Sequence, residues 1–406
     1  MKALVLAGGV PQIALIKELK SRWFNVVLCD YLDNPAAKSC ADVFYQVSTL
    51  DIEGILMVAK KEKVDMVITV CTDQALLTMA KVSEILQLPC YLDYATALNV
   101  TNKEYMKKIM VENDVPTAQY CILSNGDFSK IGKFSYPLIV KPVDCNSSKG
   151  VKLVENIEDM KNAFVEAKNL SRSGNVIIEE FITGKELSVD VYVENGIAKV
   201  LCISEIEKIP KNDKFVIFRS KCLSDLQENV LNLIQKTTQR IADAFKLSNT
   251  PMLVQLINSD ENVYVLEFSA RTGGGEKFNV IKKLTGFDVV KAVVDLTMGR
   301  YPHVKDVITN SYAISEFIYC KPGILQKIVG LDELLECNVI TDAYFLKDKG
   351  TIINDISSSG DRVAGFTIVD SSLENLKMRH NKVISTLKVL DINHVDIMYH
   401  DFMTEL

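Results

Sequence analysis

Several residue types are scarce in this chain of 406 residues, and each scarcity excludes a class of protein. There are only four histidines, all C-terminal to Arg271, so a histidine base is not expected. The ten cysteines are scattered without a CxxC pair, which argues against a zinc site. Unpaired cysteines in a large chain indicate a reducing compartment, and we expect a cytoplasmic protein.

Long apolar runs and runs of like charge are also missing. No uncharged stretch approaches the roughly 18 residues of a membrane-spanning helix, so no membrane association is expected. The net charge of −6 shows no clustered basic face, so no nucleic-acid partner is expected. The N-terminus MKALVLAGGV is typical of a first strand and not of a signal peptide. The length predicts about two to four domains.

The first third of the chain alternates apolar strands with helices, which predicts an open parallel α/β sheet. We expect strands near 2–7, 26–29, 44–47, 66–70 and 89–91, and helices ending near 20 and at 51–62 and 74–87. The turn AGGVPQ lacks two glycines of the GxGxxG fingerprint, which disfavours an NAD-dependent oxidoreductase. Thr72 and Asp73 are interpreted as helix N-caps in preference to ligand contacts.

The stretch 263–276, VYVLEFSARTGGGE, is a strand that ends in polar side chains. Glu267, Ser269 and Arg271 follow at steps of two, which places them on one face. The glycines at 273–275 let backbone approach a ligand closely. This set suits a metal, a phosphate and an anionic substrate, and a surface edge strand with a salt bridge and a glycine turn is the alternative.

Two upstream segments suit a nucleotide. The strand 137–141 ends at Lys141, a charge that should be paired or bound to an anion, and a polar turn separates it from the strand 151–154. Such a turn offers hydroxyls, amides and a cation to phosphates, with a plain hairpin as the alternative. After a helix at 157–168, the strand 176–182 ends in two carboxylates and an aromatic ring, which suit a purine.

These motifs resemble the ATP-grasp ligases in order and spacing over about residues 1–310. The motifs are Lys103 on a helix capped by Thr101 or Asn102, YPLIVKP, SSKG, VIIEEFITGKE and VLEFSAR. The segments PGILQKIVG and DKGTIINDISSSGDRVAGFTIVD resemble the small closing domain of L-amino-acid ligases and biotin carboxylases.

The resemblance implies a fold of mixed α/β and α+β class with three domains. They are an N-terminal open parallel α/β domain (1–98), a two-lobed ATP-grasp domain (99–310, with a flexible lid lobe at about 124–182) and a small, mostly-β closing domain (311–406). For the last we expect strands at 313–319, 339–345 and 365–369 and a helix near 372–389, with 391–400 as one more strand or a packing tail. Asp361 and Arg362 are interpreted as a structural pair.

The resemblance implies that ATP is bound by two lysines, a lid, a hinge and a carboxylate that contacts the ribose. Lys103 and Lys141 would hold the α- and β-phosphates. A flexible lid would close over the phosphates, and it would consist of Ser147, Ser148, Lys149 and Gly150. The adenine would be bound by a hinge formed by Glu180, Phe181 and Ile182, with Glu179 beside it. Glu186 would accept hydrogen bonds from the ribose.

It also implies Mg²⁺ (or Mn²⁺) at Gln255, Glu267 and Ser269. Many family members have an acidic residue at the first position and Asn at the last, so this chain has a variant site with less negative charge. Arg271 would contact the transferred phosphoryl group and the substrate carboxylate. Backbone amides at Gly273, Gly274 and Gly275 would approach that carboxylate. Arg219 is a candidate for binding the second substrate.

The implied reaction activates a small, amino-acid-like carboxylate as an acylphosphate, which an amine attacks with release of ADP and phosphate. Arg271 and Lys141 would be the catalytic residues. The partners would be small-molecule substrates, and a homodimer is compatible with the resemblance because relatives are often dimers. Two alternatives stay open: a non-catalytic ATP-binding module, which Gln255 and Ser269 favour, and a purine-pathway or carbamoyl-phosphate-type ligase.

Overall fold

The computed structural model describes residues 1–145, 148–210, 215–223, 226–259, 262–305 and 311–406. The chain divides into two compact units that are each assembled from three segments. The first unit contains Met1–Thr117, Ser188–Ile203 and Gln227–Val307, and the second contains Ala118–Leu187, Ser204–Leu226 and Ile308–Leu406. The predicted lid residue Ser147 lies outside the described residues.

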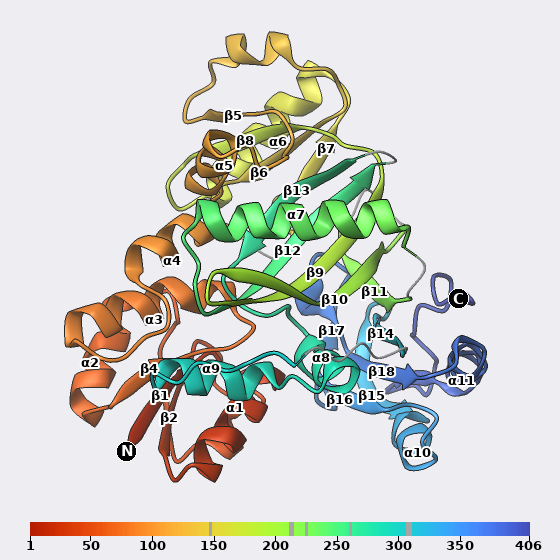
Figure 1. The fold of residues 1–406 in the computed structure, drawn as a ribbon. Coiled ribbons are helices and arrows are strands. Elements are labelled where there is room, and N and C mark those ends of the chain that lie inside the picture. The colour runs from red at the N-terminus through yellow and green to blue at the C-terminus, as the bar shows by residue number, and fades with distance from the viewer. Residues whose placement is uncertain (146–147, 211–214, 224–225, 260–261, 306–310) are drawn as a thin grey trace. The chain divides into compact units, whose positions relative to one another are not determined.

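The first unit begins with a parallel sheet in the strand order β3-β2-β1-β4. Its strands are β1 (Lys2–Leu6), β2 (Asn25–Asp30), β3 (Val43–Gln46) and β4 (Met66–Ile68). The accompanying helices are α1 (Val10–Ser21), α2 (Ile52–Glu62), α3 (Asp73–Leu86), α4 (Tyr94–Thr101) and α5 (Lys103–Glu112), with the short turn η1 (Lys38–Cys40). The predicted open parallel α/β sheet is confirmed (Figure 1).

The strand predicted at 89–91 is wrong, because these residues lie in a loop between α3 and α4. Pro89 has no amide hydrogen, so a run of three residues that begins with it has little to contribute to a sheet. The short apolar pattern there reflects packing instead. Leu92, directly after the run, is buried.

The rest of the first unit is an antiparallel layer with helices. Its strands follow the order β13-β12-β9-β10, where β12 is Thr250–Ser259, β13 is Asn262–Ser269, β9 is Lys185–Glu194 and β10 is Ile197–Lys208. The ends of β9 and β10, 185–187 and 204–208, belong to the second unit. The helices are α7 (Glu228–Ala244), which packs against β13, α8 (Lys277–Thr285) and α9 (Val289–Thr297).

The second unit contains an antiparallel sheet in the order β5-β8-β6-β7. Its strands are β5 (Tyr120–Leu123), β6 (Leu138–Pro142), β7 (Lys152–Val154) and β8 (Val176–Glu180), with the turn η2 (Phe128–Lys133). Helix α6 (Ile157–Leu170) packs on this sheet, and Met160, Phe164 and Ala167 enter its apolar core. The strands and the helix that the sequence predicts here are confirmed.

The remainder of the second unit is mostly β-structure. The strand order continues β10-β11-β14-β18-β16, where β11 is Ile217–Cys222, β14 is Tyr312–Ile318, β16 is Asp342–Phe345 and β18 is Ala364–Asp370. A smaller sheet has the order β17-β15-β19, formed by β15 (Gly323–Val329), β17 (Ile352–Ile353) and β19 (Lys388–Asp391). The helices are α10 (Leu331–Glu336) and α11 (Leu373–Thr386), with the turn η3 (Ser359–Asp361).

Asp361 and Arg362 do not form the expected pair. The Asp361 carboxylate accepts hydrogen bonds from the backbone and hydroxyl of Ser357, and so closes its own turn. The Arg362 guanidinium lies over the ring of Phe317, 3.5 Å from the ring centroid, and donates to the hydroxyl of Tyr319. Adjacent residues rarely face each other, which is why the two side chains find separate partners.

Gly365 in β18 provides a test of side-chain packing in the second unit. A methyl group there would overlap the ring of Tyr344 and lie 2.9 Å from the Glu316 carbonyl oxygen. We expect Gly365→Ala to lower the free energy of unfolding by about 1–3 kcal/mol through overpacking, measured by urea denaturation. Gly132→Ala is the matched control, because nothing lies within 4 Å of its added methyl. Equal stability of the two variants would contradict the prediction.

Candidate functional site

Strand β13 and its neighbour β12 present oxygen-bearing side chains on one face in the first unit. Gln255 lies opposite Glu267 in the antiparallel register, and Leu253 lies opposite Ser269. Residues two apart on a strand share a face, so Gln255, Glu267 and Ser269 project from the same side of the sheet. The sequence prediction that these residues lie together is therefore supported by the register.

Lys103 reaches the same face from helix α5. Its Nζ lies 3.2 Å from Oε2 of Glu267, and the residue is 7% exposed. The helix begins at Lys103 because Asn102 caps it, accepting hydrogen bonds from the amides of Glu104 and Tyr105. A cation in the first turn opposes the helix dipole, so its position is stabilised by the Glu267 carboxylate instead.

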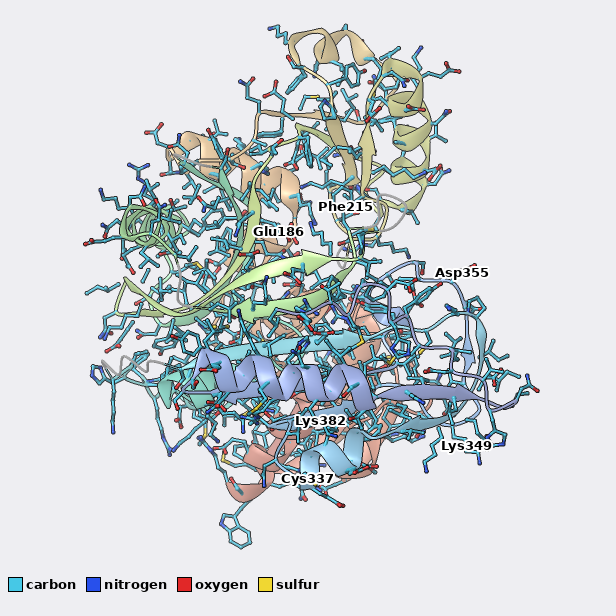
Figure 2. All side chains as sticks on the ribbon, turned by 90° about the vertical axis from the view of Figure 1, so that its right-hand side faces the viewer. Glu186, Phe215, Cys337, Lys349, Asp355 and Lys382 are labelled. Atoms are coloured by element: carbon cyan, nitrogen blue, oxygen red, sulfur yellow. The ribbon has the colours of Figure 1, made fainter. Side chains whose placement is uncertain are left out.

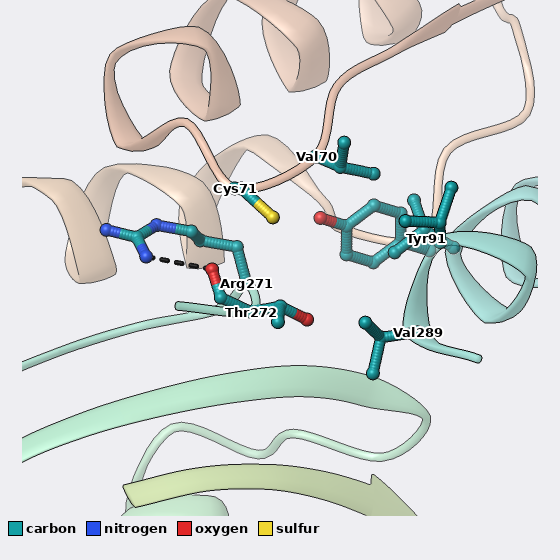
Figure 3. Close-up of a pocket in the computed structure, with 8 residues that line it drawn as sticks. Val70, Cys71, Tyr91, Arg271, Thr272 and Val289 are labelled. Atoms are coloured by element: carbon teal, nitrogen blue, oxygen red, sulfur yellow. Dashed lines mark hydrogen bonds between the residues drawn. The ribbon is translucent and has the colours of Figure 1, made fainter. Parts of the chain in front are cut away.

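Arg271, two residues beyond the end of β13, is held by Asp73 at the start of α3. Its Nε donates to Oδ1 of Asp73 at 2.7 Å, and its Nη2 bonds to Oδ2. Nη1 donates to the carbonyl of Thr272 at 2.8 Å (Figure 3). Burial disfavours the charged form of Asp73, but the charge and hydrogen bonds of Arg271 outweigh it and hold the pKa of Asp73 below its ordinary value.

The helix-cap interpretation of Thr72 and Asp73 is therefore wrong for their side chains. Thr72 stands at the N-cap position without a side-chain cap hydrogen bond. Its hydroxyl donates to the carbonyl of Val70 and accepts from Gln12. Asp73 pairs with Arg271. The position of Asp73 after β4 is the sequence signal that indicates a site residue, because ligands of open α/β sheets bind at the carboxyl ends of the strands.

Asp190 in β9 is a buried carboxylate that the sequence reasoning did not select. It is 1% exposed, and its Oδ1 accepts a hydrogen bond from the amide of Gly273 at 2.7 Å. Its Oδ2 has no hydrogen-bond partner in the described part of the chain. Burial raises the pKa of Asp190, although Lys277 and the Gly273 amide counteract this effect.

The position of Asp190 accounts for the first glycine of the run, Gly273. A Cβ at Gly273 would lie 3.0 Å from Oδ1 of Asp190 and 3.1 Å from Cγ of Lys277, so a side chain there would strain the contact. Gly274 has open space around the same position, and Gly275 has a φ of 65°. Only Gly275 needs the left-handed conformation that glycine tolerates best.

A small pocket lies beside Arg271 in the first unit (Figure 3). It is lined by Val70, Cys71, Tyr91, Arg271, Thr272, Val289, Val290 and Val293. Burial raises the pKa of the Cys71 thiol to about 12, so the thiol stays protonated and is no nucleophile near neutral pH.

In the second unit, Lys141 on β6 forms an ion pair with Glu179 on the neighbouring strand β8. Their side chains are 8% and 3% exposed. The expectation that a lysine within this apolar strand needs an anionic partner is confirmed. A buried lysine with a single carboxylate keeps donors for a further anion, since an ammonium group has three hydrogens.

The hinge and lid residues of the second unit follow these strands. Past the end of β8, Phe181 donates its amide hydrogen to the Pro137 carbonyl at 3.2 Å, and its side chain is exposed. Ile182 follows Phe181 in the chain and is partly buried. In the lid turn, the Ser148 hydroxyl donates to the Phe215 carbonyl at 3.0 Å. Lys149 is exposed and Gly150 has a φ of 74°.

Glu186, the predicted ribose contact, is labelled in Figure 2. It forms an ion pair with Lys208. The Lys208 ammonium also lies 4.9 Å from the centre of the Phe215 ring. Glu180 accepts a long hydrogen bond, 3.4 Å, from the amide of Ser135. A ligand that binds Glu186 or Glu180 must therefore displace Lys208 or the Ser135 amide.

Arg219 is placed away from solvent, inside the second unit. It is 1% exposed and donates from Nε to Glu316 at 2.7 Å, from Nη1 to Glu207 at 3.0 Å and from Nη2 to the Thr404 carbonyl at 2.7 Å. All three nitrogens are therefore engaged within the protein. Arg219 is therefore not part of the proposed substrate site.

The comparison with protein families identifies the middle of the chain. The family model of the ATP-grasp domain matches residues 134–279, the segment that holds Lys141, Glu179, Glu186, Glu267 and Arg271. The chain contains an ATP-grasp domain. The resemblance based on the motifs is thereby confirmed for this segment.

Two curated relatives extend the likeness. A phosphoribosylamine–glycine ligase from Lactococcus lactis is 26% identical over 215 residues, which cover 50% of this chain and 51% of that protein. The bifunctional purine biosynthetic protein purD of Dictyostelium discoideum is 23% identical over 331 residues, covering 70% and 40%. The chain thus spans about half the length of these relatives.

Among solved structures, an L-amino acid ligase from Bacillus licheniformis superposes with a TM-score of 0.80 at 20% identity. The match covers 96% of this chain and 98% of that one. At this identity the likeness shows the fold, and it confirms the mixed α/β architecture over nearly the whole chain. No helix of the described residues has both the length and the apolar character needed to cross a membrane.

Proposed function

We propose that the protein is an ATP-dependent ligase that joins a small carboxylate to an amine. The observation that carries the proposal is the row of Glu267, Ser269 and Arg271 within the segment matched by the ATP-grasp model, with the Lys103 ammonium 3.2 Å from Glu267. One short stretch thus combines oxygen ligands, a fixed guanidinium fork and a neighbouring lysine. This combination suits phosphoryl transfer, which needs positioning and charge neutralisation more than a protein nucleophile.

The reaction has two steps. A carboxylate oxygen of the substrate attacks the γ-phosphorus of ATP, the bond between that phosphorus and the β-bridging oxygen breaks, and ADP leaves. The nitrogen of a neutral amine then attacks the acyl carbon, the bond from that carbon to the phosphate oxygen breaks, and the nitrogen loses a proton. The products are an amide, ADP and inorganic phosphate.

The roles of the lysines follow from their surroundings. Lys141 is held by Glu179 and Lys103 by Glu267, so both ammonium groups keep a fixed position before any ligand arrives. Preorganised cations stabilise the charge that develops on phosphate oxygens without reorganising during the reaction. We assign these two lysines to the phosphates of ATP, with the adenine at the hinge of Glu180, Phe181 and Ile182.

The metal that ATP-grasp chemistry implies would be held by Gln255, Glu267 and Ser269. Amide, carboxylate and hydroxyl oxygens are hard donors of the kind Mg²⁺ prefers, and the register places them on one face, so the residues fit. No group of three His, Cys, Asp or Glu suited to a metal occurs within the described ranges. When bound, Mg²⁺ would supply positive charge to the phosphate oxygens.

The decisive experiment measures ADP release by the full chain with ATP, Mg²⁺ and a panel of small carboxylates. Hydroxylamine serves as the amine, because it traps acylphosphates as hydroxamates whatever the natural amine is. We expect ADP and hydroxamate to form in equal amounts with at least one carboxylate. Binding of ATP without any ADP release would support the alternative of a non-catalytic ATP-binding module.

Lys103 provides a specific test of nucleotide binding. We expect Lys103→Met to raise the KM for ATP by about tenfold or more, since a charge-assisted contact to a phosphate contributes about 1.5–3 kcal/mol. The measurement is the ATP dependence of ADP release. Lys108→Met on the same helix is the matched control, because Lys108 is exposed. If the two variants had the same KM, Lys103 would not contact the nucleotide.

A further inference from the structure

Asp190 is a buried carboxylate that the proposed reaction does not use directly. It lies in β9, whose residues from Ser188 to Val193 are all buried, and it is itself 1% exposed. Its Oδ1 accepts a hydrogen bond from the Gly273 amide at 2.7 Å, whereas its Oδ2 has no hydrogen-bond partner in the described part of the chain. A carboxylate with an unpaired oxygen is costly in such surroundings, so stability alone does not account for it.

The hydrogen bond to Asp190 fixes one peptide group. The amide hydrogen of Gly273 and the carbonyl oxygen of Thr272 belong to the same planar trans peptide, in which they point in opposite directions. The amide is bound to Asp190, and the carbonyl oxygen accepts a hydrogen bond from Nη1 of Arg271 at 2.8 Å (Figure 3). Both polar groups of this peptide are therefore held by charged side chains, one on each side.

The same peptide group completes the hydrogen bonding of Arg271. Its Nε and Nη2 bind Asp73, and its Nη1 binds the Thr272 carbonyl. A guanidinium is planar, so directed bonds at all three nitrogens fix its plane as well as its position. If the peptide group between Thr272 and Gly273 rotated, Nη1 would lose its acceptor, and only Asp73 would orient the guanidinium.

Gly273 lies directly against Asp190. A Cβ at this glycine would lie 3.0 Å from Oδ1 and 3.2 Å from Oδ2 of Asp190. Burial raises the pKa of Asp190 overall, and the positive charges of Lys277 and Arg271 counteract this effect only in part. Since neither cation offsets the burial, the contacts indicate that Asp190 serves as the acceptor for the Gly273 amide.

We propose that Asp190 is a positioning residue that holds the Thr272–Gly273 peptide group and, through the Thr272 carbonyl, orients the Arg271 guanidinium. The inference rests on the proposed function for the part that Arg271 has in the reaction. It adds a residue that contacts neither ATP nor substrate. It also commits the Gly273 amide to Asp190, so the expected approach of glycine amides to the substrate carboxylate is limited to Gly274 and Gly275.

Hydrogen exchange of the Gly273 amide tests the first step without turnover. The measurement is NMR of the full chain carrying isotope-labelled glycine, with the signal assigned by its absence in Gly273→Ala. We expect exchange to be about tenfold or more faster in Asp190→Ala than in the wild type, because a charge-assisted hydrogen bond is lost. Asp190→Asn should stay slow, since its side-chain oxygen accepts the same bond. Asp190→Val is a second variant without an acceptor and keeps an apolar strand residue if Asp190→Ala does not fold.

Rotation of the Arg271 guanidinium about its Nε–Cζ bond tests the second step. It is measured by NMR with isotope-labelled arginine, and the signal is assigned with Arg271→Lys. We expect rotation to be about tenfold faster in Asp190→Ala than in Asp190→Asn, because Nη1 loses its fixed acceptor. Val191→Ala is the control for both NMR measurements. Val191 is buried in the same strand, and adjacent strand residues face opposite sides of a sheet, so this variant loosens β9 without removing the acceptor.

The assay of ADP release tests the consequence for the reaction. Asp190→Ala should lower the rate at saturating ATP by about 10–100-fold, as expected when a distant change misplaces a catalytic group. The KM for ATP should stay unchanged, because Asp190 contacts none of the residues assigned to the nucleotide. Asp190→Asn should recover most of the lost rate, and Val191→Ala should keep the wild-type rate.

The inference is overturned if the Gly273 amide exchanges equally fast in the wild type and Asp190→Ala, or if the guanidinium rotates equally fast in Asp190→Ala and Asp190→Asn. A rate of ADP release as low in Asp190→Asn as in Asp190→Ala would also overturn it, because the charge and not the accepted hydrogen bond would then matter. Absence of ADP release from the wild type would reject the proposed reaction alone, since the two NMR measurements need no turnover.

Discussion

Arg271→Lys should reduce the rate of ADP release by about 10²–10³-fold at saturating ATP. A lysine keeps the positive charge, but its single ammonium cannot reproduce the planar fork that binds Asp73 through Nε and Nη2. The transferred phosphoryl group and the substrate carboxylate would both lose an oriented partner. The measurement is the initial rate of ADP release with the carboxylate that the wild type uses fastest.

A matched variant tests whether replacing an arginine by lysine lowers the rate of ADP release at any position in the chain. Arg300→Lys makes the same change at an exposed arginine that lies 3.8 Å from Asp295. We expect its rate to equal that of the wild type. If Arg271→Lys retained the wild-type rate, Arg271 would not contact the reacting groups, and the proposed mechanism would be wrong at its centre.

Much of this fold could be predicted from the sequence because the strands are short apolar runs bounded by glycine, proline or polar turns. The runs around Leu4, Val27 and Val67 are buried and form the parallel sheet as expected. The run at 89–91 has the same appearance but forms no strand. Local patterns do not specify whether a segment finds a strand partner, which depends on tertiary packing. The boundaries of the three predicted domains remain a prediction.

The candidate site was predictable only where its residues lie within one motif. Glu267 and Ser269 are spaced by two in β13, so their shared face follows from the sequence, and Arg271 follows two residues beyond the strand. Asp73 and Asp190 are 198 and 83 residues away from the groups they bind, Arg271 and Gly273. No local pattern links such positions. The partner of a buried charge is fixed by topology, and a sequence can only indicate that a partner must exist.

Arg219 illustrates the same limit and leads to the largest expected effect on stability. The sequence offered it as a substrate ligand, whereas the structure surrounds it with Glu316, Glu207 and the Thr404 carbonyl. Glu316 is fully buried and also lies 2.8 Å from Nε2 of His380. We expect Arg219→Met to lower the free energy of unfolding by about 3–5 kcal/mol, because Glu316 would lose its principal cation. Urea denaturation measures this loss.

The double variant Arg219→Met/Glu316→Leu distinguishes an ion pair from simple loss of packing. Removing both charges leaves no buried carboxylate without its cation, so the double variant should be more stable than Arg219→Met alone. The candidate role in binding the amine makes the opposite prediction. In that case Arg219→Met would keep the wild-type stability and raise the KM for the amine, and the buried network around Glu316 would contribute nothing to the fold.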